Sequence, residues 1–139
     1  SEEEARRAGT PYTPSSYRLD DLDRAIADGE THGFVKVLTR PGTDVILGAT
    51  CVSTHAAEII AEFVLAMTHG LGLGKVLGTI HIYPTFAEAN KHVAGAWKRT
   101  TVTPGQEQLL AAFHAWQRGA GGLGDVFAAA RGALRRERR

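Results

Sequence analysis

The order of apolar and polar residues predicts a chain that mixes strands and helices. The pattern predicts two strands, at residues 34–38 and 45–52. The turn between them, at residues 40–44, predicts that they form a β-hairpin. Gly48 lies inside the second strand and indicates a bulge or a close neighbour. A helix cap at Ser1 and the acidic turn that runs to Glu4 predict a short helix over residues 1–8, which Gly9 ends. Apolar residues at helical spacing predict helices over residues 54–69, 86–97 and 104–118 and a last helix that carries Val126, Phe127, Ala130 and Leu134.

The stretches between these elements complete the expected organisation. Residues 10–16 are expected to be extended or loop, and residues 71–75 a glycine-rich link. Residues 100–105 are expected to be a linker. The prediction is therefore one domain over residues 1–99 and a helical pair over residues 100–139.

Composition narrows the classes of partner. The chain has 139 residues and a net charge of +1, which gives no strong field toward nucleic acid or a membrane surface. Its apolar runs stay well short of the ~20 residues of a membrane span. One cysteine, Cys51, excludes an internal disulfide and suits a reducing, cytoplasmic compartment. Six histidines show no helical pair at a metal-ligand spacing, so no metal site is predicted.

The stretch from Thr79 to Glu88 has the strongest local signals. Thr85 and Glu88 stand three residues apart, the spacing of a capping box at a helix start. Pro84 removes a backbone donor and biases Tyr83 toward an extended conformation. We expect a rigid corner that presents His81, Tyr83 and the helix start on one side. The alternative is that Thr85 and Glu88 only cap the helix and that Tyr83 only packs.

This corner resembles a known signature. The run Tyr83-Pro84-Thr85-Phe86-Ala87-Glu88 is similar to the His-Pro-Thr-x-x-Glu motif of the flavin-dependent pyridine nucleotide-disulfide oxidoreductases, which include glutathione reductase, dihydrolipoamide dehydrogenase and mercuric reductase. The motif lies in their C-terminal dimerisation domain. Residues 1–9, 23–36, 46–49 and 57–60 also resemble this domain, so the resemblance covers roughly residues 1–97.

The resemblance implies a fold and an assembly. The fold class is α+β, an antiparallel sheet with helices packed on it, here without the domain's first strand and with an added C-terminal helical pair. The long helix and the corner are expected to build a homodimer in which the corner of one subunit reaches the flavin of the other. The full-length parent is expected to be an oxidoreductase of redox homeostasis that uses FAD and NAD(P)H in its other regions. The chain alone is expected to bind neither cofactor and to be inactive.

The resemblance also implies candidate catalytic residues. Glu88 matches the family's carboxylate, His81 matches an outer histidine of some members, and Tyr83 replaces the catalytic histidine. Tyr83 and Pro84 are the expected contacts to the partner subunit's FAD. Imidazole has a reference pKa of about 6.5 and phenol of about 10, so Tyr83 is a poor base at neutral pH. We therefore expect a parent closer to mercuric reductase, or to members with quinone or unknown acceptors, than to ordinary disulfide reductases.

Two other classes remain open at this point. In the first alternative, the chain is a stand-alone dimeric interaction module without catalysis, in which Tyr83 and Glu88 are purely structural. In the second alternative, it is a small metal- or nucleic-acid-binding protein that uses its histidines and its arginine-rich end. The coding sequence before Ser1 separates the flavoenzyme hypothesis from these two alternatives. A flavoenzyme would show a Gly-x-Gly-x-x-Gly after a strand and a Cys-x4-Cys further on.

Overall fold

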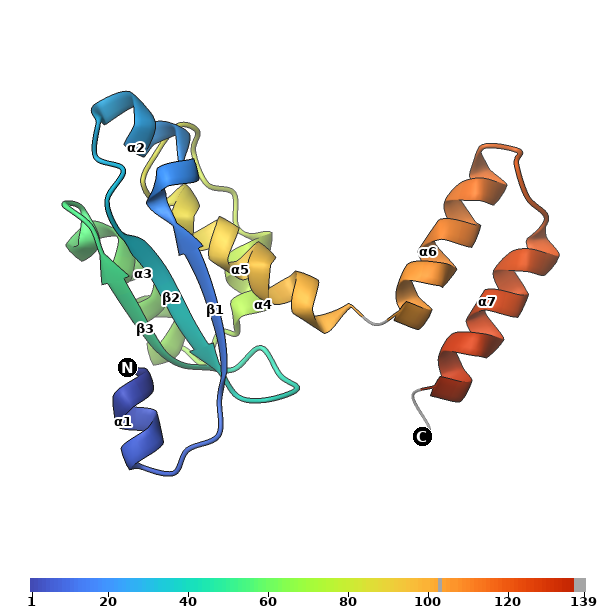
Figure 1. Cartoon of the computed structure of the whole chain (residues 1–139), viewed down its shortest axis with the longest axis horizontal. Coiled ribbons are helices and arrows are strands. Elements are labelled where there is room, and N and C mark those ends of the chain that lie inside the picture. Colours follow the sequence, from blue (N-terminus) through green and yellow to red (C-terminus); the bar gives the residue numbers. More distant parts are fainter. Residues whose placement is uncertain (103, 137–139) are drawn as a thin grey trace. The chain divides into compact units, whose positions relative to one another are not determined.

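A computed structural model of the chain describes residues 1–102 and 104–136, with side chains described as far as residue 133. The chain divides into two compact units, Ser1–Thr100 and Thr101–Arg139. Each unit is considered by itself below (Figure 1).

The first unit is an antiparallel sheet with helices on it, as expected. Its sheet has the strand order β1-β2-β3, and Tyr17, Val35 and Cys51 lie side by side across it. The elements follow one another as α1 (Glu2–Arg7), β1 (Thr13–Arg18), a 3₁₀ turn (Leu19–Asp21), α2 (Asp23–Asp28), β2 (Phe34–Thr39), β3 (Ile46–Val52), α3 (Ala56–Thr68), α4 (Leu73–Gly78) and α5 (Glu88–Thr101).

The core lies between one face of the sheet and the helices α3, α4 and α5 (Figure 1). Successive strand residues point to opposite faces, so Val35 and Val37 are fully buried on the core side while Lys36 points to the other side. Of the predicted apolar stripe of residues 86–97, Ala89, Val93 and Trp97 are buried on α5, whereas Phe86 is partly buried and lies before the helix begins. The helical partners of the two valines include Ile59, Phe63, Leu73, Val76, Val93 and Trp97.

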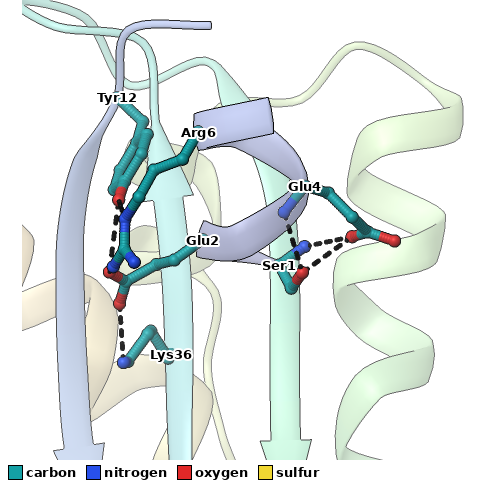
Figure 2. Close-up of polar contacts among 6 residues, drawn as sticks. All are labelled: Ser1, Glu2, Glu4, Arg6, Tyr12 and Lys36. Carbon is teal, nitrogen blue, oxygen red and sulfur yellow. Dashed lines mark hydrogen bonds and ion pairs between the residues drawn. The ribbon is translucent and has the colours of Figure 1, made fainter. Parts of the chain in front are cut away.

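Helix α1 is held on the opposite face of the sheet by charge. It has no buried residue, and Ser1 closes a full capping box with Glu4. The Glu2 carboxylate accepts hydrogen bonds from Lys36 Nζ at 2.7 Å, Arg6 Nη2 at 2.9 Å and Tyr12 Oη at 3.2 Å (Figure 2). Since Lys36 belongs to β2, this cluster joins the helix to the middle strand.

The hairpin contains the bulge that Gly48 indicates. The pairing passes from Leu38 opposite Gly48 to Thr39 opposite Ile46, so Leu47 is the extra residue. A Cβ added at Gly48 would have no neighbour within 4 Å. The bulge interpretation is confirmed, and the close-neighbour interpretation is wrong.

Two local expectations are corrected, and a third is decided between its two alternatives. Residues 10–16, expected to be extended or loop, are extended from Thr13 as strand β1, because β2 supplies the pairing partner. Helix α3, expected to be capped by Ser53 or Thr54, is instead capped at His55 without a side-chain bond, and the Ser53 hydroxyl accepts from His55 N–H. Residues 73–78 form α4, whose first amide groups, Leu73 and Gly74, bond the backbone carbonyl and the carboxylate of Asp44.

The second unit is a helical hairpin of α6 (Pro104–Gln117) and α7 (Leu123–Arg136). Gly119 has a positive φ of 71° at the turn, the left-handed conformation that glycine adopts most readily. The helices approach closely at the other end, where a Cβ on Gly105 would lie 2.9 Å from the Ala133 Cα. Within the described residues, no helix of either unit has the length and apolar character to cross a membrane.

Candidate functional site

The corner between α4 and α5 is built around a cis peptide bond between Tyr83 and Pro84. The Glu88 carboxylate accepts the Thr85 backbone N–H at 3.1 Å, which is one half of the expected capping box. The other half is absent. The Thr85 hydroxyl donates to the Ile82 carbonyl at 2.6 Å, so it ties the corner to the residue before Tyr83 and not to the helix amides.

His81 points inward from the corner to a carboxylate on α3. Its Nε2 lies 3.0 Å from Glu62 Oε2, and its Nδ1 lies 3.0 Å from the Thr79 carbonyl oxygen. The side chain is only 4% exposed. Both ring nitrogens therefore face acceptor oxygens. The imidazolium can donate to both at once, whereas either neutral tautomer can donate to only one.

Asn90 of α5 holds Glu62 in place. It is fully buried, and its Nδ2 donates to Glu62 Oε2 at 2.8 Å and to the Ile59 carbonyl at 2.8 Å. Its Oδ1 has no hydrogen-bond partner among the described residues. Sequence reasoning missed both Glu62 and Asn90. The sequence did contain a signal for them, because each is a polar residue beside the apolar stripe of its helix. A polar side chain that is buried at such a position needs a hydrogen-bond partner.

Tyr83 stands on the outer side of the corner. Its residue surface is 68% exposed, and its hydroxyl donates to Asp23 Oδ2 at 2.9 Å. This hydrogen bond and the charge of Asp23 raise the pKa of Tyr83 above that of free phenol, with a smaller contribution from Glu88. The phenol is therefore a neutral hydrogen-bond donor at physiological pH.

The three predicted catalytic residues do not converge on one point. His81 is paired with Glu62, Tyr83 with Asp23, and the Glu88 carboxylate with the Thr85 amide. The outer and inner sides of the corner are thus chemically different. The outer side exposes a phenol and a proline, and the inner side holds an imidazole–carboxylate pair.

An apolar groove of about 490 Å³ runs beside the inner side of the corner. It is bounded by α3, α4 and residues 79–87, with Glu62 and His81 among its lining. Three large apolar residues along it are strongly exposed: Leu65 at 58%, Ile80 at 87% and Ile82 at 71%. Surface of this kind, rimmed by polar groups, marks an interaction site.

Other candidate chemistry is limited in the part of the chain described. Burial raises the pKa of the Cys51 thiol, which disfavours the reactive thiolate. The described residues include no group of three or more potential ligands placed to hold a metal. The His81 imidazole, the Tyr83 hydroxyl and the Glu88 carboxylate are each bonded to another group of this chain.

Comparison with known proteins agrees with this architecture. Residues 1–94 match the family described as pyridine nucleotide-disulphide oxidoreductase, dimerisation domain. Dihydrolipoamide dehydrogenase of Chaetomium thermophilum is 38% identical over 96 residues, which are 69% of this chain and 19% of that protein. Dihydrolipoyl dehydrogenase of Trypanosoma brucei brucei is 39% identical over 102 residues, which are 73% of this chain and 21% of that protein. The chain thus spans about a fifth of the length of these relatives.

Solved structures show the same fold. LpdA of Mycobacterium tuberculosis superposes with a TM-score of 0.63 at 24% identity and covers 72% of this chain and 21% of its own. The flavoprotein disulfide reductase RclA of Escherichia coli, solved as a Cu(II) complex, has a TM-score of 0.64 at 23% identity, covering 68% of this chain and 22% of its own. The family match covers most of the chain, so this protein belongs to the pyridine nucleotide-disulphide oxidoreductases, whose dimerisation domain its residues 1–94 form.

Proposed function

We propose that this chain is the dimerisation and interface domain of an FAD- and NAD(P)H-dependent oxidoreductase and that it completes the active site of a partner subunit. The observation that carries the proposal is the apolar groove of a domain whose family is defined by dimerisation. Leu65, Ile80 and Ile82 are exposed along that groove, although the same unit has a well-formed core of its own.

The proposed homodimer forms through α3 and the corner. The apolar residues Val64, Leu65 and Met67 at the exposed side of α3 are 57%, 58% and 42% exposed. Burial of apolar surface stabilises association by about 25 cal/mol per Å² before the entropy of association is subtracted. A second copy offers the same surface, so a two-fold contact would cover the groove on both subunits.

The corner then has two roles. On its outer side, Tyr83 and Pro84 would contact the FAD bound by the partner subunit, with Tyr83 as a neutral hydrogen-bond donor. On its inner side, Glu62 orients the His81 imidazole, which is an acid–base group of the corner. Glu88 supports both sides, because its carboxylate fixes the Thr85 amide.

The cofactors belong to other regions of the parent protein. FAD would supply electron transfer between the nicotinamide and the acceptor when bound there. This chain's own residues shape the interface, exclude water from it and donate a hydrogen bond at Tyr83 Oη. We propose that the isolated chain is inactive, and that the parent is cytoplasmic, in keeping with the single cysteine.

The chemistry of Tyr83 favours some electron acceptors of the parent enzyme over others. A phenol whose pKa is raised cannot act as the neutral-pH base of a thiol–disulfide reaction. We therefore propose an acceptor other than a simple disulfide, either a thiolate-bound metal, as in mercuric reductase, or a quinone-type acceptor. The sequence relatives reported above are dihydrolipoyl dehydrogenases, so reduction of lipoamide is the competing activity to be measured.

One experiment tests the proposal on the parent enzyme. The full-length protein is purified and assayed for bound flavin and for NAD(P)H oxidation with lipoamide, a mercuric salt and a quinone as acceptors. The proposal expects a yellow flavoprotein that is dimeric and prefers the metal or quinone acceptor. Lipoamide turnover as fast as that of a typical family member would refute the acceptor assignment, and a protein without flavin would refute the enzyme assignment.

A stand-alone interaction module is the second candidate. The observation that favours it is that Tyr83 and Glu88 are both bonded within the chain, to Asp23 and Thr85. A coding sequence that starts at this domain, with a purified product that dimerises without flavin, would select this candidate.

A further inference from the structure

The C-terminal hairpin, α6 and α7, carries its large apolar side chains on the outside. Among the side chains described between residues 101 and 133, no apolar side chain is buried, and Gly105 is the sole buried residue. Alanines are the commonest half-buried residues, and Leu109 and Val126 are half-buried with them. Five other large apolar residues are exposed by more than a third: Leu110 53%, Phe113 37%, Trp116 39%, Leu123 51% and Phe127 59%.

The packing of the two helices explains this arrangement. Ala133 lies so close to Gly105 that no side chain fits between them. Half-buried Ala112, Ala115 and Ala129 continue the pattern of small residues. This seam lets the helices approach, and Leu109 and Val126 are partly covered beside it, but no described apolar side chain of the hairpin is fully buried. A hairpin of this size therefore requires a further partner for stability.

We propose that the hairpins of two copies of this chain pack against each other through these five apolar residues as a four-helix arrangement. The proposal rests on the homodimer proposed above, which always supplies a second hairpin in equal amount. A two-fold contact matches a surface to itself, and each hairpin carries the same stripe. Four helices with a shared apolar centre form a stable and common arrangement.

The area available favours a tethered second copy over an independent partner. An aromatic side chain buries about 150–250 Å² when fully covered, so the exposed parts of the three aromatic residues amount to about 200–350 Å² per hairpin. With the exposed parts of Leu110 and Leu123 added, two such surfaces only come close to the roughly 1,000 Å² of an independent stable interface. Two hairpins joined to one dimer meet at an effective concentration on the order of millimolar, where a weak contact suffices.

The charged residues fit the same arrangement. Glu107 precedes Leu110 by three residues and Arg131 follows Phe127 by four, so a charge of opposite sign continues the apolar stripe of each helix. Both residues are exposed. Glu107 lies near the start of α6 and Arg131 in the second half of α7, so both are at the end of the hairpin away from its turn. Opposite charges at one end of the stripe give a polar rim that complements its own copy.

Sedimentation equilibrium on three chains separates this proposal from the homodimer itself. The chains are residues 1–139, the Trp116→Ser/Phe127→Ser variant and residues 1–100, whose core is complete because each of its members lies at or before Trp97. We expect dimers of residues 1–100, a dissociation constant at least about 10-fold lower for the full chain, and loss of that gain in the variant. Equal constants for all three chains would overturn the hairpin pairing alone. Monomers of residues 1–100 together with dimers of 1–139 would overturn the α3 interface and the tethering argument, and would assign the dimer contact to residues 101–139 alone.

The Trp116→Ser/Phe127→Ser variant could lose the gain in affinity only because its hairpin fails to fold. A matched control variant and a second measurement separate that outcome from loss of the contact. Gln108→Ser changes an exposed polar residue of α6 and is expected to leave the constant unchanged. In a Cys51→Ser chain, the single substitutions Leu110→Cys, Phe113→Cys and Phe127→Cys are oxidised in turn. At least one is expected to give a disulfide-linked dimer faster than Gln108→Cys does. Cross-linking no faster than that control at all three positions means that the stripe covers its own chain or another protein, and overturns the proposal.

Discussion

The Nε2 atom of His81 lies 3.0 Å from an oxygen of Glu62, a carboxylate that reaches the corner from α3. The corner of this chain therefore pairs an imidazole with the long interface helix, while Glu88 is used to fix the Thr85 amide. Any change of the groove that shifts α3 would shift the imidazole with it. This relationship links the proposed self-association surface to the one buried imidazole of the corner.

Asn90 is expected to be the residue on which this pairing depends. Replacing it as Asn90→Leu removes the donor to Glu62 and to the Ile59 carbonyl, and a buried acceptor left unpaired costs about 1–3 kcal/mol. Chemical denaturation should show a loss of unfolding free energy of that size. Lys91→Leu on the exposed side of α5 is the control, with a change within about 0.5 kcal/mol. Equal stability of the two variants would contradict a structural role for Asn90.

Gly72 is expected to tolerate a side chain poorly. A Cβ there would lie 2.2 Å from the carboxyl carbon of Asp44, whose carboxylate accepts from Gly74 N–H and whose backbone carbonyl accepts from Leu73 N–H. Gly72→Ala should lower the free energy of unfolding by about 0.5–1.5 kcal/mol, because the carboxylate must turn away and lose its bond to Gly74. Gly78→Ala is the matched control, since a Cβ there meets nothing within 4 Å and alanine favours the helix by up to about 1 kcal/mol. A stable Gly72→Ala protein would contradict the assigned contact.

The Glu2 cluster is expected to make α1 sensitive to acid. Hydrogen bonding to Lys36 is the largest cause that lowers the pKa of Glu2 below its ordinary value. A carboxyl with a lowered pKa contributes stability above the ordinary pKa and loses it as pH falls through the folded value. Glu2→Gln should therefore be less stable than the parent chain at neutral pH, with the difference vanishing in acid.

The measurement for Glu2 is thermal unfolding at a series of pH values. Glu3→Gln serves as the control, because Glu3 pairs with Arg7 on the exposed side of the helix and makes no bond to the sheet. A difference between Glu2→Gln and the parent that stays constant down to low pH would contradict the ionic origin of this contact.

Tyr17 and Tyr83 are expected to ionise late. Burial, followed by the charges of Asp21 and Asp23, raises the pKa of Tyr17 to about 12, and Asp23 also raises the pKa of Tyr83. Because these folded values exceed the unfolded value of about 10, the associated stability is complete below that pH and is lost as pH rises through the folded values. Ultraviolet titration of the chain beside Tyr17→Phe and Tyr83→Phe assigns each step. A tyrosinate signal near neutral pH that disappears in Tyr83→Phe would contradict the donor role of Tyr83.

Local signals in the sequence predicted those elements whose cause is local. The Ser1 and Glu4 capping box, the β-hairpin with its bulge at Gly48 and the stripe of α5 all follow from residues a few positions apart. Helix α4 was not predicted, because its glycine-rich start is fixed by Asp44 from a distant loop. The partners of His81 and Tyr83 were not predicted either. Glu62 and Asp23 reach the corner only through the packing of α3 and α2, which spacing along the chain does not reveal.

The most direct test of the account is the mass of the chain in solution by sedimentation equilibrium, measured beside Leu65→Glu in the groove and Val52→Glu, a matched change at an exposed site on the sheet. The account predicts twice the chain mass for the parent and for Val52→Glu. It predicts a single chain mass for Leu65→Glu, because a charge in the apolar contact should weaken association by about 100-fold or more. A parent chain that stays monomeric at high concentration, or a Leu65→Glu chain that dimerises as tightly as Val52→Glu, would contradict it.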